Sequence, residues 1–131
     1  MNHESIHTLV KKIAQQLAPL YEHADERDQI AWWIVEYCTG KNIGELLALE
    51  SLPDDPELEH RIAQLVHQHV HEHMPLQYLL GSVPFIDITL QVEPPVLIPR
   101  PETEEWVFNL IQELHTLRHK MLRILDIGTG S

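Results

Sequence analysis

The residues that most plainly predict chemistry stand at the end of the chain. Asp126 is followed by Gly128 and Gly130, and a mostly apolar run over residues 121–125 precedes them. A buried strand that ends in a carboxylate and runs into glycines is typical of nucleotide-type cofactor sites, since glycines let the backbone approach a ligand. This turn matches the start of both dinucleotide-binding and S-adenosylmethionine-binding folds. A plain strand-to-helix turn is the simpler alternative.

A second candidate is the segment over residues 98–104, where Pro99 and Pro101 flank Arg100. Residues before proline are pushed out of the helical region, so the two prolines stiffen the backbone around the arginine. A guanidinium presented in this way can bind a carboxylate through two hydrogen bonds. Taken alone, the segment is better explained as a stiff linker that leads into a capped helix.

Four histidines alternate over residues 67–73 and could suggest a metal site. On the helix that the surrounding pattern predicts, only the pairs His67/His71 and His69/His73 are neighbours, and these pairs lie on different faces. The rest of a ligand set is missing. We therefore expect a solvated helix face and no metal site.

Trp32, Trp33 and Tyr37 form an aromatic group on a predicted helix. Aromatic side chains on a helix face belong to a core or to a partner-binding surface, and we expect core here. Adjacent Trp32 and Trp33 cannot point the same way, so one of the two would be exposed or lie against another helix.

The first part of the chain has the period of amphipathic helices. Short links between these helices favour a small antiparallel bundle. The predicted boundary residues are Ile6 and Pro19 for the first helix, Asp25 and Gly40 for the second, Asn42 for a short third helix that includes Leu49, and Asp54 or Asp55 with Pro56 for the fourth.

Beyond these helices the period changes to two. Apolar and polar residues alternate over residues 86–92, which predicts a half-buried strand, and residues 96–98 are the expected returning strand of a hairpin. A helix then begins at Glu102 or Thr103, and a final strand covers residues 121–125. The apolar face of that helix would consist of Trp106, Val107, Leu110, Ile111 and Leu114.

The chain has 131 residues, of which 20 are acidic and 9 basic, for a net charge of −11. Such a chain would repel phosphate backbones, so we expect no direct nucleic-acid binding. The charge favours a basic protein partner, but the simpler explanation is that it only keeps the surface soluble.

The single Cys38 excludes an internal disulfide framework. No apolar stretch approaches the roughly 20 residues needed to cross a membrane. The sequence starts without a secretory or mitochondrial leader pattern, so a cytoplasmic location is expected.

Three motifs, in order, carry a resemblance to a known family. They are Pro-Leu-Gln-Tyr-Leu-Leu-Gly over residues 75–81, followed by Phe85, then Leu-Ile-Pro-Arg-Pro-Glu-Thr-Glu over residues 97–104, and Ile-Leu-Asp-Ile-Gly-Thr-Gly-Ser over residues 124–131. With this order and spacing the chain resembles the release-factor glutamine methyltransferases (PrmC/HemK). The resemblance is strong from Met74 to the end of the sequence. Over the first 73 residues it depends only on helical character and position.

The resemblance implies an enzyme that moves a methyl group from S-adenosylmethionine to the side-chain amide nitrogen of a glutamine. That glutamine lies in the Gly-Gly-Gln loop of class I peptide-chain release factors. For this chain the resemblance implies a mainly α fold class with three parts. They are a helical substrate-recognition domain over residues 1–74, a β-hairpin linker over residues 75–100, and the first helix and strand of a truncated α/β methyltransferase domain over residues 101–131.

The resemblance also implies roles for individual residues. The first cofactor loop would contain Asp126, Gly128, Thr129, Gly130 and Ser131. Close to the active site, the substrate would be bound by Arg100, Glu102 and Thr103.

The family's Asn-Pro-Pro-Tyr motif, which holds the substrate glutamine, would come further along and is not among these residues. We therefore expect this fragment to contain no catalytic residue, to bind the cofactor too weakly to measure, and to act in release-factor recognition. Two alternatives stay open. One is a related amino-methyltransferase that acts on another protein or on nucleic acid, and the other is a stand-alone helical interaction module over residues 1–74.

Overall fold

The computed structural model describes residues 5–49, 55–117 and 121–128. Its contacts divide the chain into two compact units. Unit 1 spans Met1–Leu80 and unit 2 spans Gly81–Ser131. Among the described residues, no helix is both long and apolar enough to span a membrane.

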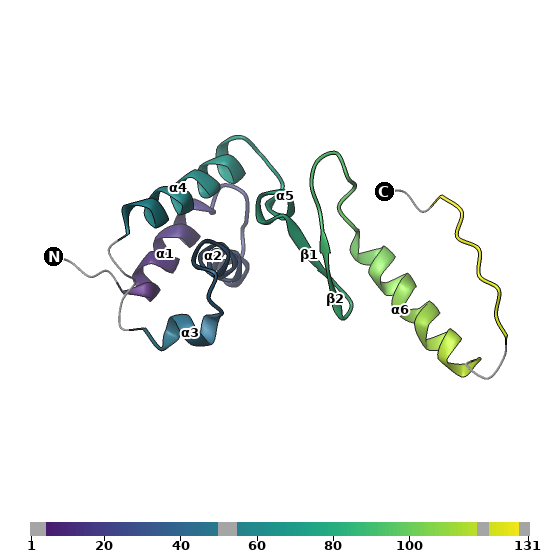
Figure 1. Ribbon diagram of the computed structural model, residues 1–131. Helices are drawn as coiled ribbons and strands as arrows, with labels where there is room; N and C mark the ends of the chain where they lie inside the picture. The colour runs from purple at the N-terminus through teal and green to yellow at the C-terminus, as the bar shows by residue number, and fades with distance from the viewer. Residues whose placement is uncertain (1–4, 50–54, 118–120, 129–131) are drawn as a thin grey trace. The chain divides into compact units, whose positions relative to one another are not determined.

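Unit 1 is helical, and capping side chains mark where three of its helices begin. The Ser5 and Asp55 side chains each accept backbone N–H groups of the following turn, and Asn42 and Glu45 form a reciprocal capping box. Gly40 ends the second helix in the left-handed conformation, with a φ of 67°. These caps confirm the predicted starts of the first, third and fourth helices and the predicted end of the second. The first helix ends at Gln16, before the predicted Pro19, and a short fifth helix over residues 76–80 was not predicted. The helices are α1 (Ile6–Gln16), α2 (Ala24–Thr39), α3 (Ile43–Leu47), α4 (Pro56–His71) and α5 (Leu76–Leu80) (Figure 1).

The core of unit 1 is built mainly from α1, α2 and α4. Each of these helices buries apolar residues at spacings of three and four, as an amphipathic helix requires. Burying one such large side chain contributes about 1.5–3 kcal/mol, so the core holds the short helices together. The third helix ends at Leu47, so Leu49 lies beyond it and packs against the core from outside the helix. The fully buried large side chains are Leu17, Ile34, Val35 and Leu46.

The aromatic group of α2 does not form core as predicted. Trp32 packs against the core, but Trp33 is 44% exposed and Tyr37 is 53% exposed. The buried face of α2 contains Ile34 and Cys38, and each exposed aromatic residue stands one position before one of them, which turns it away from that face. The expectation that the two tryptophans point different ways is confirmed.

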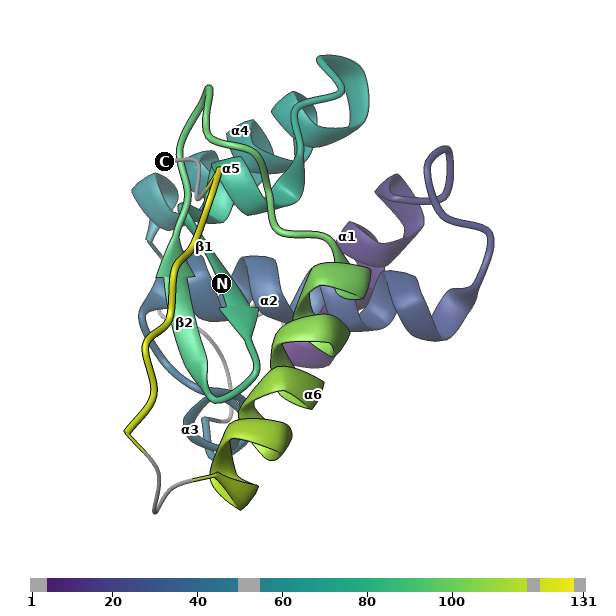
Figure 2. The ribbon, with the colours of Figure 1, turned by 90° about the vertical axis from the view of Figure 1, so that its right-hand side faces the viewer.

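Unit 2 begins with a two-stranded antiparallel hairpin. Strand β1 (Ser82–Phe85) pairs with β2 (Ile88–Gln91), and the pair Phe85/Ile88 leaves a two-residue turn (Figure 2). The prediction of a returning strand over residues 96–98 is wrong. The strand that pairs with β2 is β1, which comes before β2 in the chain. After β2 the backbone turns instead, and the Val96 N–H donates to the Glu93 carbonyl at 2.8 Å.

The predicted pattern of burial in the hairpin is also only partly right. Ile86, expected at the start of a strand, lies in the turn, and Ile88 is 59% exposed. Leu90 is half-buried and Val92 is buried, as the alternation predicted.

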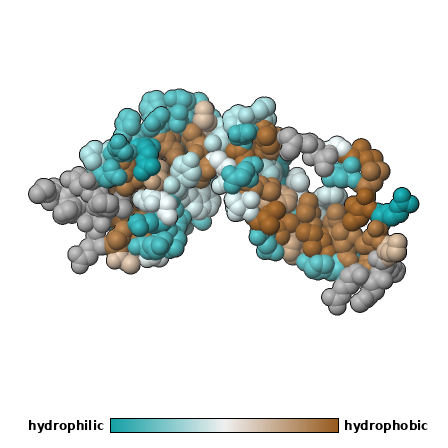
Figure 3. Space-filling view, viewed as in Figure 1, coloured by the Kyte–Doolittle hydropathy of each residue, from teal (hydrophilic) through white to brown (hydrophobic). Residues whose placement is uncertain are grey.

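Helix α6 (Pro101–Thr116) begins slightly earlier than predicted, because proline is well suited to the first position of a helix. Val107, Leu110, Ile111 and Leu114 are half-buried, whereas Trp106 is 64% exposed. No described residue of α6 is fully buried. Figure 3 accordingly shows apolar side chains gathered over this helix at the surface of unit 2.

Residues 121–126 have no regular secondary structure, residues 127–128 form a bend, and none of them pairs with a strand within the described chain. Leu125 is 81% exposed and Ile127 is 85% exposed. The strand predicted over residues 121–125 is therefore not formed in this structure, because a strand of this apolar kind depends on neighbouring strands for its hydrogen bonds and its burial. The predicted mainly helical fold class with a hairpin is confirmed.

Candidate functional site

The tip of the hairpin is tied to the first turn of α6 by one hydrogen bond. The Ile86 N–H donates to Glu104 Oε1 at 2.5 Å. Ile86 has a φ of 54°, whereas Asp87, the second turn residue, has no positive φ. In a two-residue hairpin this conformation at the first position favours glycine, and a β-branched residue there is strained. The Glu104 carboxylate thus stabilises a turn that the sequence alone disfavours.

An open depression of about 420 Å³ lies beside this contact. It presents three carboxylates together with apolar surface, so its chemistry suits a cation or a donor of N–H groups. Glu104 is already engaged with Ile86, which leaves the other two carboxylates to define the polar character of the depression. The lining residues are Ile86, Asp87, Pro101, Glu104, Glu105 and Phe108.

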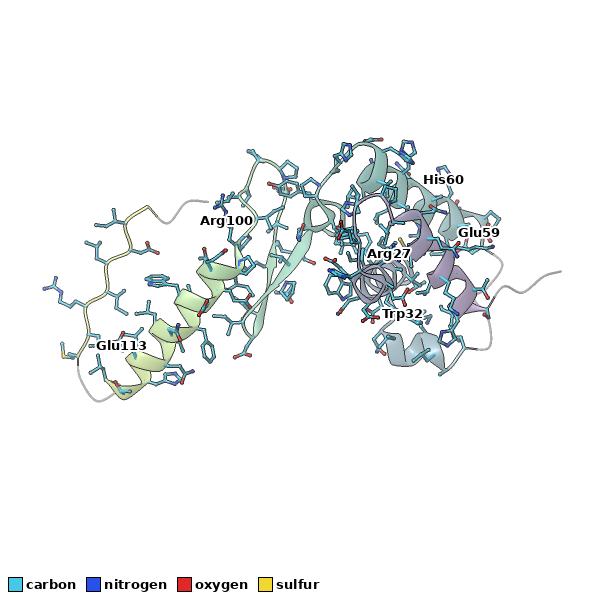
Figure 4. The ribbon with its side chains drawn as sticks, turned by 180° about the vertical axis from the view of Figure 1, so that it is seen from behind. Arg27, Trp32, Glu59, His60, Arg100 and Glu113 are labelled. Atoms are coloured by element: carbon cyan, nitrogen blue, oxygen red, sulfur yellow. The ribbon has the colours of Figure 1, made fainter. Side chains whose placement is uncertain are left out.

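The predicted substrate residues lie on the same stretch of chain but do not line this depression. Arg100 is the N-cap of α6 and is exposed, at the N-terminal end of the helix in Figure 4. Its carbonyl accepts the N–H groups of Thr103 and Glu104, and its side chain makes no capping bond. Glu102 and Thr103 are exposed on the first turn. Their role in binding a substrate stays a prediction.

Sequence reasoning missed the other residues of the depression. Asp87 and Phe108 line the same depression only because the hairpin turn packs against α6. The turn itself is Ile86-Asp87, and it lacks the Asn-Gly or Asp-Gly pair by which a hairpin is usually predicted from sequence. The exposed acidic first turn of α6 was the only available signal.

The predicted cofactor residues are described in part. Asp126 and Gly128 are exposed, and Gly128 has a φ of 78°. A Cβ at Gly128 would meet no atom within 4 Å, so glycine is favoured there by the backbone conformation and not by a lack of space. This left-handed conformation fits the predicted glycine turn. Thr129, Gly130 and Ser131 lie outside the described residues.

A buried histidine joins two distant parts of unit 1. His69 is 6% exposed, and its Nδ1 lies 2.7 Å from the Met74 carbonyl oxygen. A carbonyl can only accept, so Nδ1 carries a proton and donates it. Nε2 of His69 lies 2.8 Å from the hydroxyl of Tyr21, which donates to it when the ring is neutral. Burial, followed by the nearby charge of Glu26, raises the pKa of Tyr21.

The histidine run is therefore not a uniformly solvated face, and the prediction for His69 is wrong. His67, His71 and His73 are exposed, as predicted. The rings of His67 and His71 lie 4.9 Å apart, and His67 Nδ1 lies 3.5 Å from Glu72 Oε1. Over the described ranges, no group of three or more histidine, cysteine or acidic side chains is placed to hold a metal ion.

Cys38 is the free cysteine of α2 and is buried. Burial raises the pKa of its thiol, and the guanidinium of Arg61 partly opposes that effect. Arg61 Nη2 also donates to the Cys38 carbonyl at 3.1 Å, which links α4 to the end of α2. A buried thiol with a raised pKa is a poor nucleophile, so Cys38 is structural.

Comparison with known proteins identifies the family. Residues 8–81 match the family model of the PrmC N-terminal domain. The chain is 34% identical over 110 residues to the release factor glutamine methyltransferase of Bacillus subtilis, an alignment that covers 82% of this chain and 38% of that protein. It is 53% identical over 58 residues to the probable MRF1 mitochondrial N(5)-glutamine methyltransferase mtq1 of Schizosaccharomyces pombe, covering 44% of this chain and 19% of the relative.

A third relative is the release factor glutamine methyltransferase of Gloeobacter violaceus, with 44% identity over 71 residues that cover 54% of this chain and 24% of that protein. The chain thus spans well under half the length of these curated relatives. The family model covers more than half of the chain and includes α1 from residue 8 onward and all of α2, α3, α4 and α5. The chain belongs to the release factor glutamine methyltransferase family, and residues 8–81 are its PrmC N-terminal domain.

Proposed function

We propose that this chain is the N-terminal part of an S-adenosylmethionine-dependent methyltransferase that acts on the glutamine of the Gly-Gly-Gln loop in class I peptide-chain release factors. The observation that carries this proposal is the match of residues 8–81 to the PrmC N-terminal domain, together with relatives named as release factor glutamine methyltransferases. A substrate that terminates translation would place the enzyme where ribosomes work, in the cytoplasm.

The backbone conformation of Gly128 supports S-adenosylmethionine as the cofactor of this enzyme. The left-handed φ of Gly128 is the conformation that lets backbone N–H groups face a ligand, and Asp126 stands two residues before it. Asp126 and Gly128 would thus help to hold S-adenosylmethionine, with Thr129, Gly130 and Ser131 completing the loop. When bound, this cofactor supplies an electrophilic methyl group on a sulfonium centre.

Methyl transfer to an amide nitrogen makes demands that the described residues do not meet. The nitrogen is a poor nucleophile because its lone pair is delocalised, so an enzyme must hold the amide hydrogens and align the nitrogen in an enclosed site. The carboxylates of unit 2 line an open depression, and Glu104 is already bonded to Ile86. We therefore assign recognition of the release factor to this part of the enzyme.

The charge of unit 1 supports recognition of a basic protein. Its 80 residues include 13 acidic side chains against 5 basic ones. Two of the basic side chains are engaged with backbone carbonyls, since Arg27 Nη1 donates to Tyr21 and Arg61 Nη2 donates to Cys38. The remaining field attracts positive surfaces and repels phosphate backbones.

Calorimetric titration of the 131-residue chain with a purified class I release factor tests this proposal. We expect saturable binding that weakens when the salt concentration is raised from about 50 to about 200 mM, because exposed charges are screened. A parallel titration with transfer RNA serves as the control and should show no binding. Failure of the release factor to bind at low salt would refute the recognition role, and binding of the RNA alone would favour a nucleic-acid methyltransferase.

The same calorimeter tests whether this chain alone binds the cofactor. We expect no measurable binding of S-adenosylmethionine to this chain, because the described cofactor residues Asp126 and Gly128 are exposed and a cofactor site needs groups that enclose its ligand. Micromolar binding would show that the terminal loop is a complete site.

A further inference from the structure

Helix α2 exposes two large aromatic side chains one turn apart. Trp33 is 44% exposed and Tyr37 is 53% exposed, and their spacing of four places them on one side of the helix. Their neighbour Trp32 has a different environment, since its ring lies edge-on to His7 of α1 with a centroid distance of 5.9 Å. Tryptophan and tyrosine are the residues most enriched at the energetic centres of protein interfaces.

Helix α3 adds apolar surface beside this pair. The side chain of Glu36, which is a neighbour of Trp33 on α2, accepts the Ile43 N–H at 2.6 Å and so brings the start of α3 next to the aromatic residues. Ile43 is 43% exposed and Leu47, one turn later, is 50% exposed. We call the four side chains of Trp33, Tyr37, Ile43 and Leu47 the aromatic face.

The aromatic face is held in place before any partner binds. The capping box of Asn42 and Glu45 fixes the first turn of α3, with distances of 2.9 and 3.0 Å. Leu46, between Ile43 and Leu47 in the sequence of α3, is fully buried and so anchors this helix to the core. A preformed surface loses little conformational entropy on binding, which favours affinity.

The net charge of unit 1 favours a basic partner for the aromatic face. Glu26 stands two helical turns before Trp33 on the same side of α2, and unit 1 as a whole carries 13 acidic side chains against 5 basic ones. An arginine side chain can stack on an exposed tryptophan while its charge faces carboxylates, which combines a cation–π contact with charge attraction. A phosphate backbone or an anionic membrane would be repelled.

We propose that the aromatic face is the surface on which this chain binds a basic, arginine-containing segment of its protein substrate. This inference rests on the proposed function, because it takes the class I release factor as the source of that segment. It adds a location, namely α2 and α3 of unit 1, and a chemistry, namely arginine stacking on Trp33 and Tyr37.

The test compares the wild-type chain with the double variant Trp33→Ala, Tyr37→Ala in the release-factor titration. Both side chains are half exposed, and alanine favours helix, so the double variant should keep the helical circular dichroism and melting temperature of the wild type. We expect its affinity for the release factor to be at least tenfold weaker. The matched control is Leu20→Ala, which removes an exposed apolar side chain outside the aromatic face and should bind as the wild type does.

The outcomes separate this inference from the function beneath it. Equal binding by the wild type and the double variant would overturn the aromatic face and leave release-factor recognition intact. Absence of binding by the wild type would overturn both. If sedimentation shows that the wild type self-associates and the double variant does not, the face joins two copies of this chain and the proposal is wrong.

Discussion

The carboxylate of Glu104 accepts a hydrogen bond from the backbone N–H of Ile86 at 2.5 Å, although the two residues are 18 positions apart in the chain. The contact joins the motif over residues 97–104 to the tip of the β1–β2 hairpin. It gives an acceptor to the Ile86 N–H, which lies in the turn and is not paired between the strands. It also stabilises the left-handed backbone conformation of Ile86. At least one acidic residue of this motif therefore has a structural role in unit 2.

Replacing Glu104 should release the tip of the hairpin. A hydrogen bond to a charged group contributes roughly 1.5 kcal/mol, so Glu104→Ala should speed amide hydrogen exchange at Ile86 by about tenfold. Glu104→Gln keeps an acceptor oxygen and should show a smaller effect. The neighbouring exposed Glu105→Ala is the matched control. Equal exchange rates at Ile86 in all four proteins would disprove the contact.

Glycine at position 86 should relax the turn. A left-handed conformation costs a side chain with a Cβ about 1–2 kcal/mol, whereas glycine loses roughly 0.5–1 kcal/mol of chain entropy on folding. Ile86→Gly should therefore stabilise the hairpin slightly, seen as slower amide exchange in β1 and β2. Ile88→Gly, within β2, should have the opposite effect. Faster exchange in Ile86→Gly would mean that the isoleucine side chain matters more than its backbone.

Removal of the Tyr21 hydroxyl should destabilise unit 1. In Tyr21→Phe, Nε2 of the buried His69 loses its partner, and an unsatisfied buried group costs about 1–3 kcal/mol. Urea unfolding followed by tryptophan fluorescence measures this change. Tyr37→Phe, at an exposed tyrosine, should change the free energy of unfolding by less than about 0.5 kcal/mol. Equal values for the two variants would argue against the Tyr21–His69 bond.

Stability should fall in alkaline solution. Burial raises the pKa of Cys38 above its usual 9.0 and the pKa of Tyr21 above its usual 10.0. A pKa that is higher in the folded chain than in the unfolded chain gives stability that is complete below the unfolded value and is lost as pH rises through the folded one. The free energy of unfolding should thus decline above pH 9.0, and Cys38→Ala should remove the first part of the decline. A profile for Cys38→Ala that declines just as the wild type does from pH 9.0 would refute the role of the thiol.

The first four helices of unit 1 were predictable because their signals are local, whereas the short α5 was not predicted. Asp55 with Pro56, Asn42 and Gly40 act within one turn of where they stand, so the sequence already shows their effect. The hairpin register was not predictable, since the Ile86–Asp87 turn lacks the usual turn residues and depends on Glu104 from a distant helix. The strand predicted over residues 121–125 failed for a similar reason, because an apolar strand forms only where neighbouring strands pair with it.

The sequence was more informative about the family than about the candidate site, whose residues stay predictions. The motifs identified the family, and the conformation of Gly128 agrees with the predicted glycine turn. Trp33 and Tyr37 were expected in the core because aromatic side chains usually are buried, but they are exposed. The sequence of one helix does not tell whether another element packs against the flank of its apolar face. Their exposure became evident only from the packing of α2 against α1 and α4.

The most direct test of the central claim is competition with a working relative. The release factor glutamine methyltransferase of Bacillus subtilis would methylate a class I release factor in the presence of increasing amounts of this chain. If the chain recognises the release factor, it should raise the apparent KM for that substrate and leave kcat unchanged, because it occupies the same substrate without taking part in the chemistry. An apparent KM that stays constant at a large excess of the chain would contradict the account.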